Sequence, residues 1–288
     1  MAQHTFSIVP RGPFGWEAAV SSLCRLPVLG HVWSGDARGL RLSLLADGDF
    51  APVDVALRFE GGALRGEVSD PSRAGEVERQ VARMFSLDHD GTGWGALAAR
   101  EPELGALVRR FSGLRPVCFS SPYETACWAV VSQRVQRAQA ARVMASLIAA
   151  VGARGHFPHP ERLRRVRTLR GLADVKVARL RGVAEAALAG ALEVSRLRAL
   201  GEDAATKALR EVPGVGAFWS VGIYLRACGA PDVFPDEPRS VAALARLYRL
   251  GAAPSREAVA RVTDRFRPFR SWACFLLRVA DARGALAA

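Results

Sequence analysis

Lysine is almost missing from this chain, because Lys176 and Lys207 are the only lysines among its 288 residues. The 40 basic residues are therefore nearly all arginine, and they exceed the acidic residues enough to give a net charge of +12. Such an excess favours a polyanionic partner through counterion release, although an acidic membrane attracts it too. A genome rich in G and C also enriches arginine, so the composition alone does not identify the partner.

Cysteine is scarce, and the cysteines do not occur in closely spaced pairs. The five cysteines are an odd number and lie mostly in apolar helical contexts, which indicates buried thiols in a reducing cytosol rather than a disulfide framework. Their spacing does not match a zinc or iron-sulfur ligand set. We therefore expect no metal held by side chains and no cofactor.

Long apolar runs are missing as well. The longest candidate, residues 126–151, is interrupted by Gln133, Arg134 and Arg137, so no segment has the uninterrupted length of a membrane span. Half of the residues are apolar, however, and a chain of this length can bury a substantial core. The sequence predicts a compact cytoplasmic protein without membrane contact.

Residues 1–90 have the pattern of a small α+β domain. Three short β-like runs alternate with turn residues rich in glycine and aspartate, as in an antiparallel meander. Residues 76–85 then read as an amphipathic helix that can cover one face of the sheet. The three runs are residues 40–45, 53–59 and 63–68. The remainder, residues 91–288, is predicted to be a helical domain.

The most specific local feature is the Val-Pro-Gly-Val-Gly segment at 212–216. It separates a predicted helix that ends at residue 211 from an apolar run that begins at Ala217. Two glycines permit a tight hairpin that a second molecule can approach closely. The free N–H groups and the positive dipole end of the next helix then favour a phosphate, without reading sequence. The predicted contact residues are Val212, Gly214, Val215, Gly216 and Ala217.

An acidic loop follows at the distance of one helix. Asp232 begins this Pro-containing loop sixteen residues after Gly216, and Asp236 and Glu237 end it. A phosphate-binding hairpin followed by a carboxylate at this distance resembles the helix-hairpin-helix (HhH-GPD) DNA glycosylases. Residues 266–273, Phe-Arg-Pro-Phe-Arg-Ser-Trp-Ala, resemble a segment near the end of DNA-3-methyladenine glycosylase II. The order and spacing of motifs agree over residues 121–284.

This resemblance implies both a fold and an activity. The fold class is α+β, with a small N-terminal lobe of antiparallel sheet and helix followed by an all-α helix-hairpin-helix core. The activity is that of a DNA glycosylase of base excision repair, which flips out an alkylated or otherwise damaged base of double-stranded DNA and hydrolyses it to leave an abasic site. We expect a monomer associated with the bacterial nucleoid. The carbonyl groups of Val212 and Val215 are expected to be able to hold a monovalent cation, as in relatives.

A carboxylate carries this chemistry, because departure of the base builds positive charge on the deoxyribose. Aligned without a gap, the family pattern places Pro238 at the position of its catalytic aspartate, and deletion of one residue places Glu237 there. We therefore predict Glu237 as the catalytic carboxylate, with Asp236 as the alternative. Both residues also suit a structural role as caps of a helix that begins near Arg239.

A polar interruption of a long predicted helix is the second candidate DNA contact. Ser121 and Glu124 form a capping box that starts this helix, which is predicted over 123–152 with Gln133 and Arg134 in its middle. In the related enzymes this site carries a glutamine and then a residue that enters the gap left by the flipped base. Arginine can stack on bases there. The alternative is an ordinary solvated helix face.

The predicted base pocket surrounds the start of the apolar run. Phe218 occupies the position where strand-cleaving relatives carry a lysine, so no Schiff base can form there and water is the expected nucleophile. Gly222 and Arg278 replace aromatic residues of the family pocket. This change indicates weaker binding of cationic methylated purines. The substrate is therefore expected to be a neutral damaged base, or the enzyme to accept a narrower range of lesions. The predicted pocket consists of Phe218, Trp219, Gly222, Trp272 and Arg278.

A second class of function remains open from the sequence. The one-residue slip in the acidic loop and the altered pocket also fit a non-catalytic protein that binds distorted or damaged DNA and has lost the catalytic acid. Two adjacent carboxylates and a complete scaffold favour the enzyme, although a fold does not by itself establish chemistry.

Overall fold

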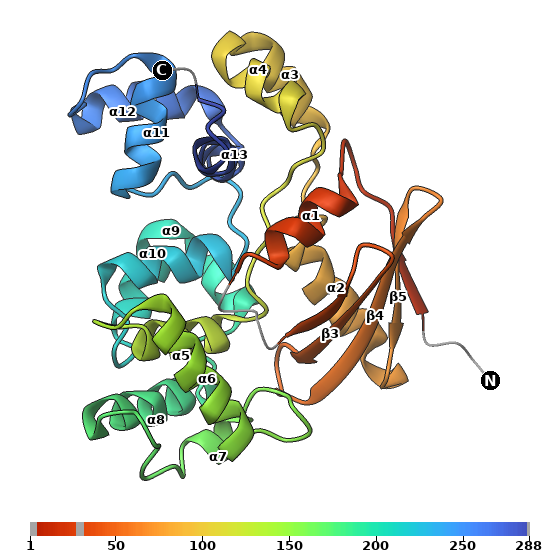
Figure 1. The fold of residues 1–288 in the computed structure, drawn as a ribbon, viewed down its shortest axis with the longest axis vertical. Coiled ribbons are helices and arrows are strands. Elements are labelled where there is room, and N and C mark those ends of the chain that lie inside the picture. The colour runs from red at the N-terminus through yellow and green to blue at the C-terminus, as the bar shows by residue number, and fades with distance from the viewer. Residues whose placement is uncertain (1–4, 27–31, 287–288) are drawn as a thin grey trace.

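The computed structural model describes residues 5–26 and 32–286. Figure 1 shows a twisted sheet with two helices on one side of the molecule and a larger helical part on the other. The predicted α+β class is confirmed. Within the described residues, the helices are all too short or too polar to span a bilayer.

The sheet is an antiparallel meander with one strand added at its edge, in the order β1-β5-β4-β3-β2. The strands are β1 (Thr5–Ile8), β2 (Trp33–Asp36), β3 (Gly39–Leu45), β4 (Pro52–Glu60) and β5 (Ala63–Val68). The three predicted runs are confirmed as β3, β4 and β5, with Leu42 opposite Val55 and Leu57 opposite Gly66. Sequence analysis missed β1 and β2, because each has only four residues.

Two helices cover this sheet. They are α1 (Trp16–Leu23) and α2 (Ala74–Met84), the latter after a 3-10 turn at Pro71–Arg73. The predicted amphipathic helix is α2, and its Val77 and Val81 are completely buried. Its polar residues Gln80 and Arg83 are buried as well, because they connect the sheet to the helical part.

The helical part divides into two groups with separate cores. The first group is α5 (Pro122–Val131), α6 (Arg137–Val151), α7 (Pro160–Leu163), α8 (Asp174–Leu188), α9 (Val194–Arg210) and α10 (Ala217–Arg226). The second is α3 (Thr92–Arg100), α4 (Pro102–Arg110), α11 (Pro238–Tyr248), α12 (Arg256–Thr263), a 3-10 turn at Asp264–Phe266 and α13 (Arg270–Ala282).

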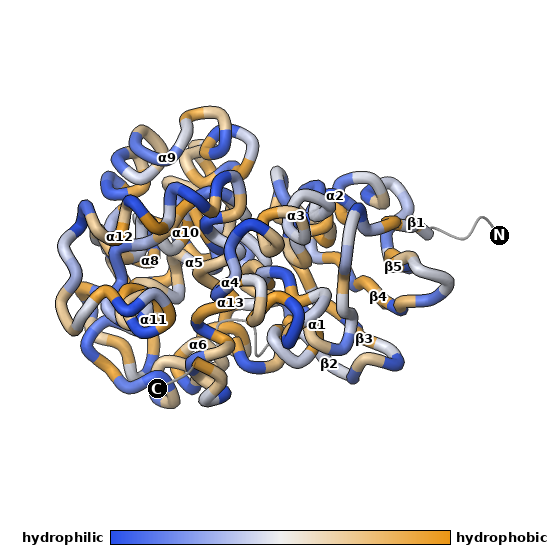
Figure 2. The backbone as a smooth tube through the Cα atoms, turned by 90° about the horizontal axis from the view of Figure 1, so that it is seen from above, coloured by the Kyte–Doolittle hydropathy of each residue, from blue (hydrophilic) through white to orange (hydrophobic). Residues whose placement is uncertain are grey.

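The first core is shared by the sheet, α1, α2 and α5 to α10. Every residue of α5 is buried, and Figure 2 shows this helix inside the molecule with α9 on the outside. The second core contains Trp94 of α3, Leu104 of α4, Leu244 of α11 and Leu277 of α13. The chain therefore passes from the second group to the first through residues 111–121, and it passes back to the second group through residues 229–237. A domain division at residue 90 stays a prediction.

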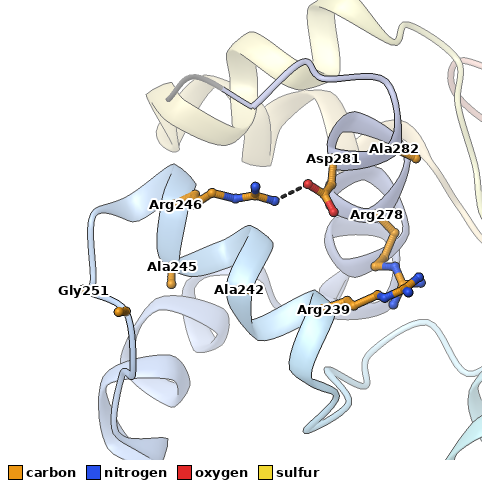
Figure 3. Close-up of a pocket in the computed structure, with 9 residues that line it drawn as sticks. Arg239, Ala242, Ala245, Arg246, Gly251, Arg278, Asp281 and Ala282 are labelled. Atoms are coloured by element: carbon orange, nitrogen blue, oxygen red, sulfur yellow. Dashed lines mark hydrogen bonds and ion pairs between the residues drawn. The ribbon is translucent and has the colours of Figure 1, made fainter.

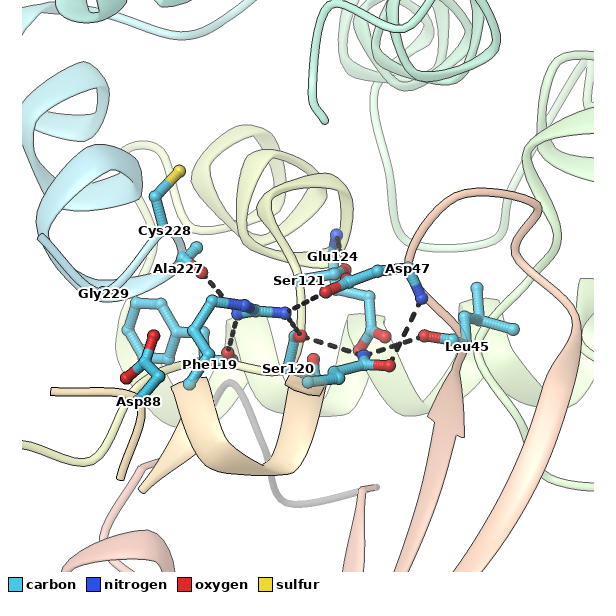
Figure 4. Close-up of polar contacts among 12 residues, drawn as sticks. Leu45, Asp47, Asp88, Phe119, Ser120, Ser121, Glu124, Ala227, Cys228 and Gly229 are labelled. Atoms are coloured by element: carbon cyan, nitrogen blue, oxygen red, sulfur yellow. Dashed lines mark hydrogen bonds and ion pairs between the residues drawn. The ribbon is translucent and has the colours of Figure 1, made fainter. Parts of the chain in front are cut away.

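Arg83 joins the sheet to the first helical group. Its guanidinium group donates to Asp47 at 2.7 Å and to the carbonyl of Ser120 at 2.9 Å, and it also contacts the carbonyls of Phe119 and Ala227 (Figure 4). The bond to Asp47 compensates part of the charge that burial would otherwise leave unpaired. This one side chain fixes a turn of the sheet against the start of α5 and the end of α10.

Two sequence-based expectations need correction. The helix predicted over 123–152 is broken, since α5 ends at Val131 and α6 begins at Arg137. A positive φ of 54° at Arg134 prevents the helix from continuing through that residue. Four cysteines are buried as expected, but Cys24 is exposed. Ser121 does cap α5 as predicted, because its hydroxyl accepts from the amide of Glu124 at 3.1 Å.

Candidate active site and nucleic-acid interface

The hairpin at 212–216 contains two glycines with different roles. Gly214 has a φ of +84°, and a Cβ atom added there would lie 2.7 Å from Cγ2 of Val130. The turn itself therefore requires this glycine. Gly216 is the N-cap of α10 with ordinary extended backbone angles, and a Cβ atom there would have nothing within 4 Å in the described structure. The fold does not require glycine at position 216. Close approach of another molecule to the backbone would require it.

Apolar contacts hold the hairpin in place. Val212 and Val215 are buried, and the amide of Val215 donates to the carbonyl of Val212 at 3.0 Å. Pro213 packs against α8, where a Cβ atom on Gly182 would lie 2.6 Å from Cγ of the proline ring. Ala217 is exposed directly after the hairpin, and no side chain caps the first amides of α10, which have no acceptor within the helix. The predicted cation on the Val212 and Val215 carbonyls stays a prediction.

Gln133 connects the break between α5 and α6 to this hairpin. Its Nε2 donates to the carbonyl of Gly214 at 2.6 Å, and its Oε1 accepts from Arg179 at 2.8 Å. Lys176 donates to the carbonyls of Val131 at 2.9 Å and Gln133 at 2.7 Å, which satisfies backbone groups left free where α5 ends. Burial lowers the pKa of Lys176, and the charge of Arg179 lowers it further. The lysine thus supports the loop at 132–136.

Arg134 lies at the tip of that loop with an exposed side chain. Its left-handed φ of 54° is uncommon for a residue with a Cβ atom and directs the side chain away from both helices. The loop borders a cavity of about 290 Å³ that Gln139, Val143 and Leu172 also line. Arg134 is therefore presented on the surface beside the hairpin, as a residue that enters DNA must be.

The first turn of α10 carries two aromatic side chains. Phe218 is 64% exposed, which is unusual for a large apolar residue. The ring of Trp219 lies 5.5 Å from it at 82° and is partly buried against the first core. A Cβ atom at Gly222 would lie 3.4 Å from Cε3 of Trp219, so the indole covers the space that a larger residue at 222 would need. Phe218 and Trp219 thus form one aromatic surface beside the hairpin.

The two predicted carboxylates have different environments. Glu237 is the N-cap of α11, where its Oε2 accepts from the amide of Ser240 at 3.0 Å and from the Ser240 hydroxyl at 2.8 Å. Its side chain is only 19% exposed and also forms an ion pair with Arg278. Asp236 is 69% exposed and points to Arg256 at 3.0 Å. Only Glu237 is a fixed, partly dehydrated carboxylate.

Hydrogen bonds keep Glu237 ionised. Burial alone raises the pKa of its carboxyl group, but the bonds from Ser240 and Arg278 outweigh that effect and leave the pKa below the ordinary value. The helix-capping role suggested by the sequence is thus confirmed for Glu237. It does not compete with catalysis, because Oε1 remains free of any bond to the described residues.

The 266–273 segment contacts the acidic loop. Asp232 accepts from Arg270 at 2.8 Å and from Arg267 at 2.9 Å. The Ser271 hydroxyl accepts from the amide of Val233 at 3.0 Å and lies 2.6 Å from the carbonyl of Ala230. These bonds fix the segment that leads to Glu237.

Arg278, the ion-pair partner of Glu237, has other cations near it. Arg278 of α13 is paired with Glu237, and Arg239 of α11 forms no ion pair with the part of the chain that the structure describes. Burial lowers the pKa of Arg226 in α10, and the nearby charges of Arg278 and Arg137 act in the same direction. Sequence analysis missed Arg226, Arg239 and Arg137, because their only signal was an arginine content that the whole chain shares.

A groove of about 450 Å³ begins at Arg239 and Arg278 and runs between α11 and α13. Figure 3 shows these two side chains extending to the same side, whereas Arg246 lies at the far end beside Asp281. The floor consists of small residues, namely Ala242, Ala245, Gly251, Ala252 and Ala282.

The structure corrects the prediction for Trp272. This side chain is only 2% exposed and lies in the second core, 5.2 Å from the Phe269 ring and 5.9 Å from the Trp94 ring. The guanidinium group of Arg115 stacks on its ring at 5.1 Å. Trp272 therefore supports α13 and does not line a pocket.

Curated proteins of similar sequence are DNA repair proteins. The chain is 25% identical over 216 residues to a DNA-3-methyladenine glycosylase of Bacillus subtilis. The matched region covers 70% of this chain and 71% of that protein. It is 29% identical over 200 residues to a probable bifunctional transcriptional activator/DNA repair enzyme AlkA of Mycobacterium tuberculosis, covering 66% of this chain but only 40% of that protein. No protein-family model matches the chain.

Solved structures share the fold. The 3-methyladenine DNA-glycosylase from Archaeoglobus fulgidus superposes with a TM-score of 0.78 at 22% identity, over 98% of this chain and 100% of that one. An 8-oxoguanine glycosylase/lyase from Clostridium acetobutylicum, in complex with double-stranded DNA, has a TM-score of 0.68 at 15% identity, over 95% and 93%. At these identities the likeness concerns the fold alone.

Proposed function

We propose that this chain, an AlkA-like member of the helix-hairpin-helix DNA glycosylases, is a base-excision-repair enzyme that removes a damaged base from double-stranded DNA by hydrolysis. The observation that carries this proposal is the state of Glu237. A partly buried carboxylate, held by Ser240 and kept ionised by its hydrogen bonds, is what stabilisation of a sugar cation requires.

The reaction breaks one bond and forms one. The bond between C1′ and the base nitrogen breaks, and its electron pair leaves with the base. Glu237 stabilises the positive charge that develops on the deoxyribose and orients the attacking water. The water oxygen bonds to C1′, and its proton passes by way of the carboxylate to the base or to solvent. The products are an abasic site and the free base.

DNA contacts are assigned to the hairpin and the adjacent loop. The uncapped amides at the start of α10, together with the open face of Gly216, suit a phosphate of the strand that carries the lesion. Arg134 suits the space left by the flipped nucleotide, since it is exposed on a loop fixed to that hairpin by Gln133.

Water, and not a lysine, is proposed as the nucleophile. Relatives of this fold include a glycosylase/lyase, so the fold does not decide this point. Phe218 lacks an amine, Lys176 is occupied by two backbone carbonyls, and Lys207 lies exposed on α9 before the hairpin. We further propose that the protein acts as a monomer on the bacterial nucleoid.

A binding protein without activity is the other hypothesis, and neither the relatives nor the geometry favours it. The test is incubation of the protein with duplexes that each contain one lesion, followed by alkali to cleave abasic sites. The lesions to compare are 3-methyladenine, 7-methylguanine, ethenoadenine, hypoxanthine and uracil. Strand cleavage that disappears in Glu237→Gln supports the enzyme. Tight DNA binding without cleavage on every duplex supports the binding protein.

A further inference from the structure

The region around Glu237 has more positive than negative charge. Its carboxylate contacts one guanidinium group directly, that of Arg278, while Arg239 lines the same groove without an acidic partner in the described structure. Asp281 is also close in sequence, but it pairs with Arg246 at the other end of the groove. Glu237 is therefore paired with Arg278, a second arginine lines the same groove, and the side chain of Arg278 is still 38% exposed and available for a ligand.

This arrangement limits where Arg278 can be relative to a substrate. A carboxylate that stabilises C1′ must contact the deoxyribose, and the base nitrogen is bonded to that same carbon. A guanidinium group that contacts the carboxylate is therefore separated from the departing base only by the carboxylate and C1′. A base with a fixed positive charge meets the Glu237–Arg278 pair and not a lone carboxylate, so the arginine offsets the attraction that the carboxylate alone would offer to that base.

The charge of the leaving group differs between two classes of lesion. A purine methylated at a ring nitrogen is cationic and departs as a neutral molecule, so it needs no positive group. A deaminated purine is neutral, and the electron pair of the broken bond makes it an anion until it receives a proton. An arginine that donates to O6 and N7 of this base stabilises that negative charge as it forms.

We propose that this glycosylase selects neutral deaminated purines, with hypoxanthine as the model case, and that Arg278 is the residue that determines this specificity. The inference rests on the proposed function. Arg278 donates to O6 and N7 as the bond to C1′ breaks, and it remains protonated throughout. Water supplies hydroxyl to C1′ and a proton to the purine, which leaves neutral. Guanine offers the same acceptors, but in a G·C pair it is harder to extrude than hypoxanthine in a mismatch.

The experiment measures single-turnover release from two duplexes that differ only in the lesion. One contains hypoxanthine opposite thymine, and the other contains 7-methylguanine opposite cytosine. Each rate is divided by the spontaneous rate of the same duplex, because the cationic base is lost faster without enzyme. We expect Arg278→Met to reduce hypoxanthine release about 100-fold and to increase 7-methylguanine release several-fold. Arg278→Lys should retain part of the hypoxanthine activity.

Arg246→Met is the matched control, because it removes one positive charge from the same groove at the end away from Glu237. It should change both rates by less than about twofold. Equal losses on both lesions in Arg278→Met would show that Arg278 only positions Glu237, and would overturn the specificity. A wild-type enzyme that enhances 7-methylguanine release more than hypoxanthine release would do the same. Absence of release from every duplex, by protein that binds DNA, would overturn the glycosylase itself.

Discussion

The side-chain amide of Gln133 donates to the carbonyl of Gly214 at 2.6 Å, across 81 residues of sequence. This bond joins the loop that carries Arg134 to the hairpin that is proposed to hold a phosphate. The two proposed DNA contacts are therefore joined by a direct hydrogen bond.

Gln133→Ala tests this connection. The substitution removes the bonds to Gly214 and Arg179, so we expect a loss of stability of about 1–3 kcal/mol and a decrease in base release of about tenfold. Binding to undamaged duplex should change less. Thermal denaturation and single-turnover kinetics measure the two effects. Ser146→Ala, on the exposed surface of α6, is the control that should leave both unchanged.

The two hairpin glycines should respond differently to substitution. Gly214→Ala introduces a Cβ atom at positive φ against Val130, so it should lower the free energy of unfolding by about 1–3 kcal/mol. Gly216→Val has room, and should lower it by less than about 1 kcal/mol through the weaker N-cap. Its expected effect is weaker binding to damaged and undamaged duplex alike, measured by fluorescence anisotropy. Unchanged binding in folded Gly216→Val would show that the hairpin is only a turn.

Glu237→Gln should reduce base release by several orders of magnitude and leave DNA affinity intact or slightly higher, because the lost charge stabilises the sugar cation but repels phosphates. The amide oxygen can still accept from Ser240, so α11 keeps its cap. Asp236→Asn, in an exposed ion pair, is the matched control and should have little effect. A severe effect of Asp236→Asn with a mild one of Glu237→Gln would move the catalytic role to Asp236.

The pH profile of base release should reflect the lowered pKa of Glu237. Because this pKa lies below the ordinary glutamate value of about 4.3, the carboxylate stays ionised from pH 7 down to pH 5, and release should not decline over that range on its account. The ionised Glu237 carboxylate contributes to the free energy of unfolding at pH values above its pKa in the unfolded chain. This contribution is lost as the pH falls through its pKa in the folded protein. Arg278→Met should raise the inflection point. A wild-type inflection near pH 6 would contradict this assignment.

Borohydride should not trap a covalent complex between this protein and DNA during turnover, because Phe218 has no amine to attack C1′. Strands should remain intact until alkali or heat is applied. Gel electrophoresis of a reaction with borohydride measures both outcomes, with an 8-oxoguanine glycosylase/lyase as the positive control. A trapped adduct would identify an amine nucleophile and exclude the hydrolytic mechanism.

Local patterns were sufficient for much of the fold. The sequence determined the meander from β3 to β5, the cap of α5 by Ser121 and the hairpin before Ala217, because turn chemistry and hydrophobic period act over a few neighbouring residues. The class of fold and the choice of Glu237 and Asp236 as candidate carboxylates followed from motif order. The short edge strands were not predictable from local patterns. Nor was the break after Val131, since it depends on the positive φ of Arg134 and on the contacts of Lys176 from α8.

Tertiary structure alone decided what the site residues do. Only the folded chain shows that Glu237 is held and partly dehydrated while its neighbour Asp236 is solvated, and that Trp272 belongs to the core. It also brings Arg278 of α13 onto Glu237 of α11, although 41 residues separate them. Burial, pKa and charge pairing depend on groups that meet only when distant segments pack together, so local patterns identified the candidate residues, and only the packing shows the environment of each one.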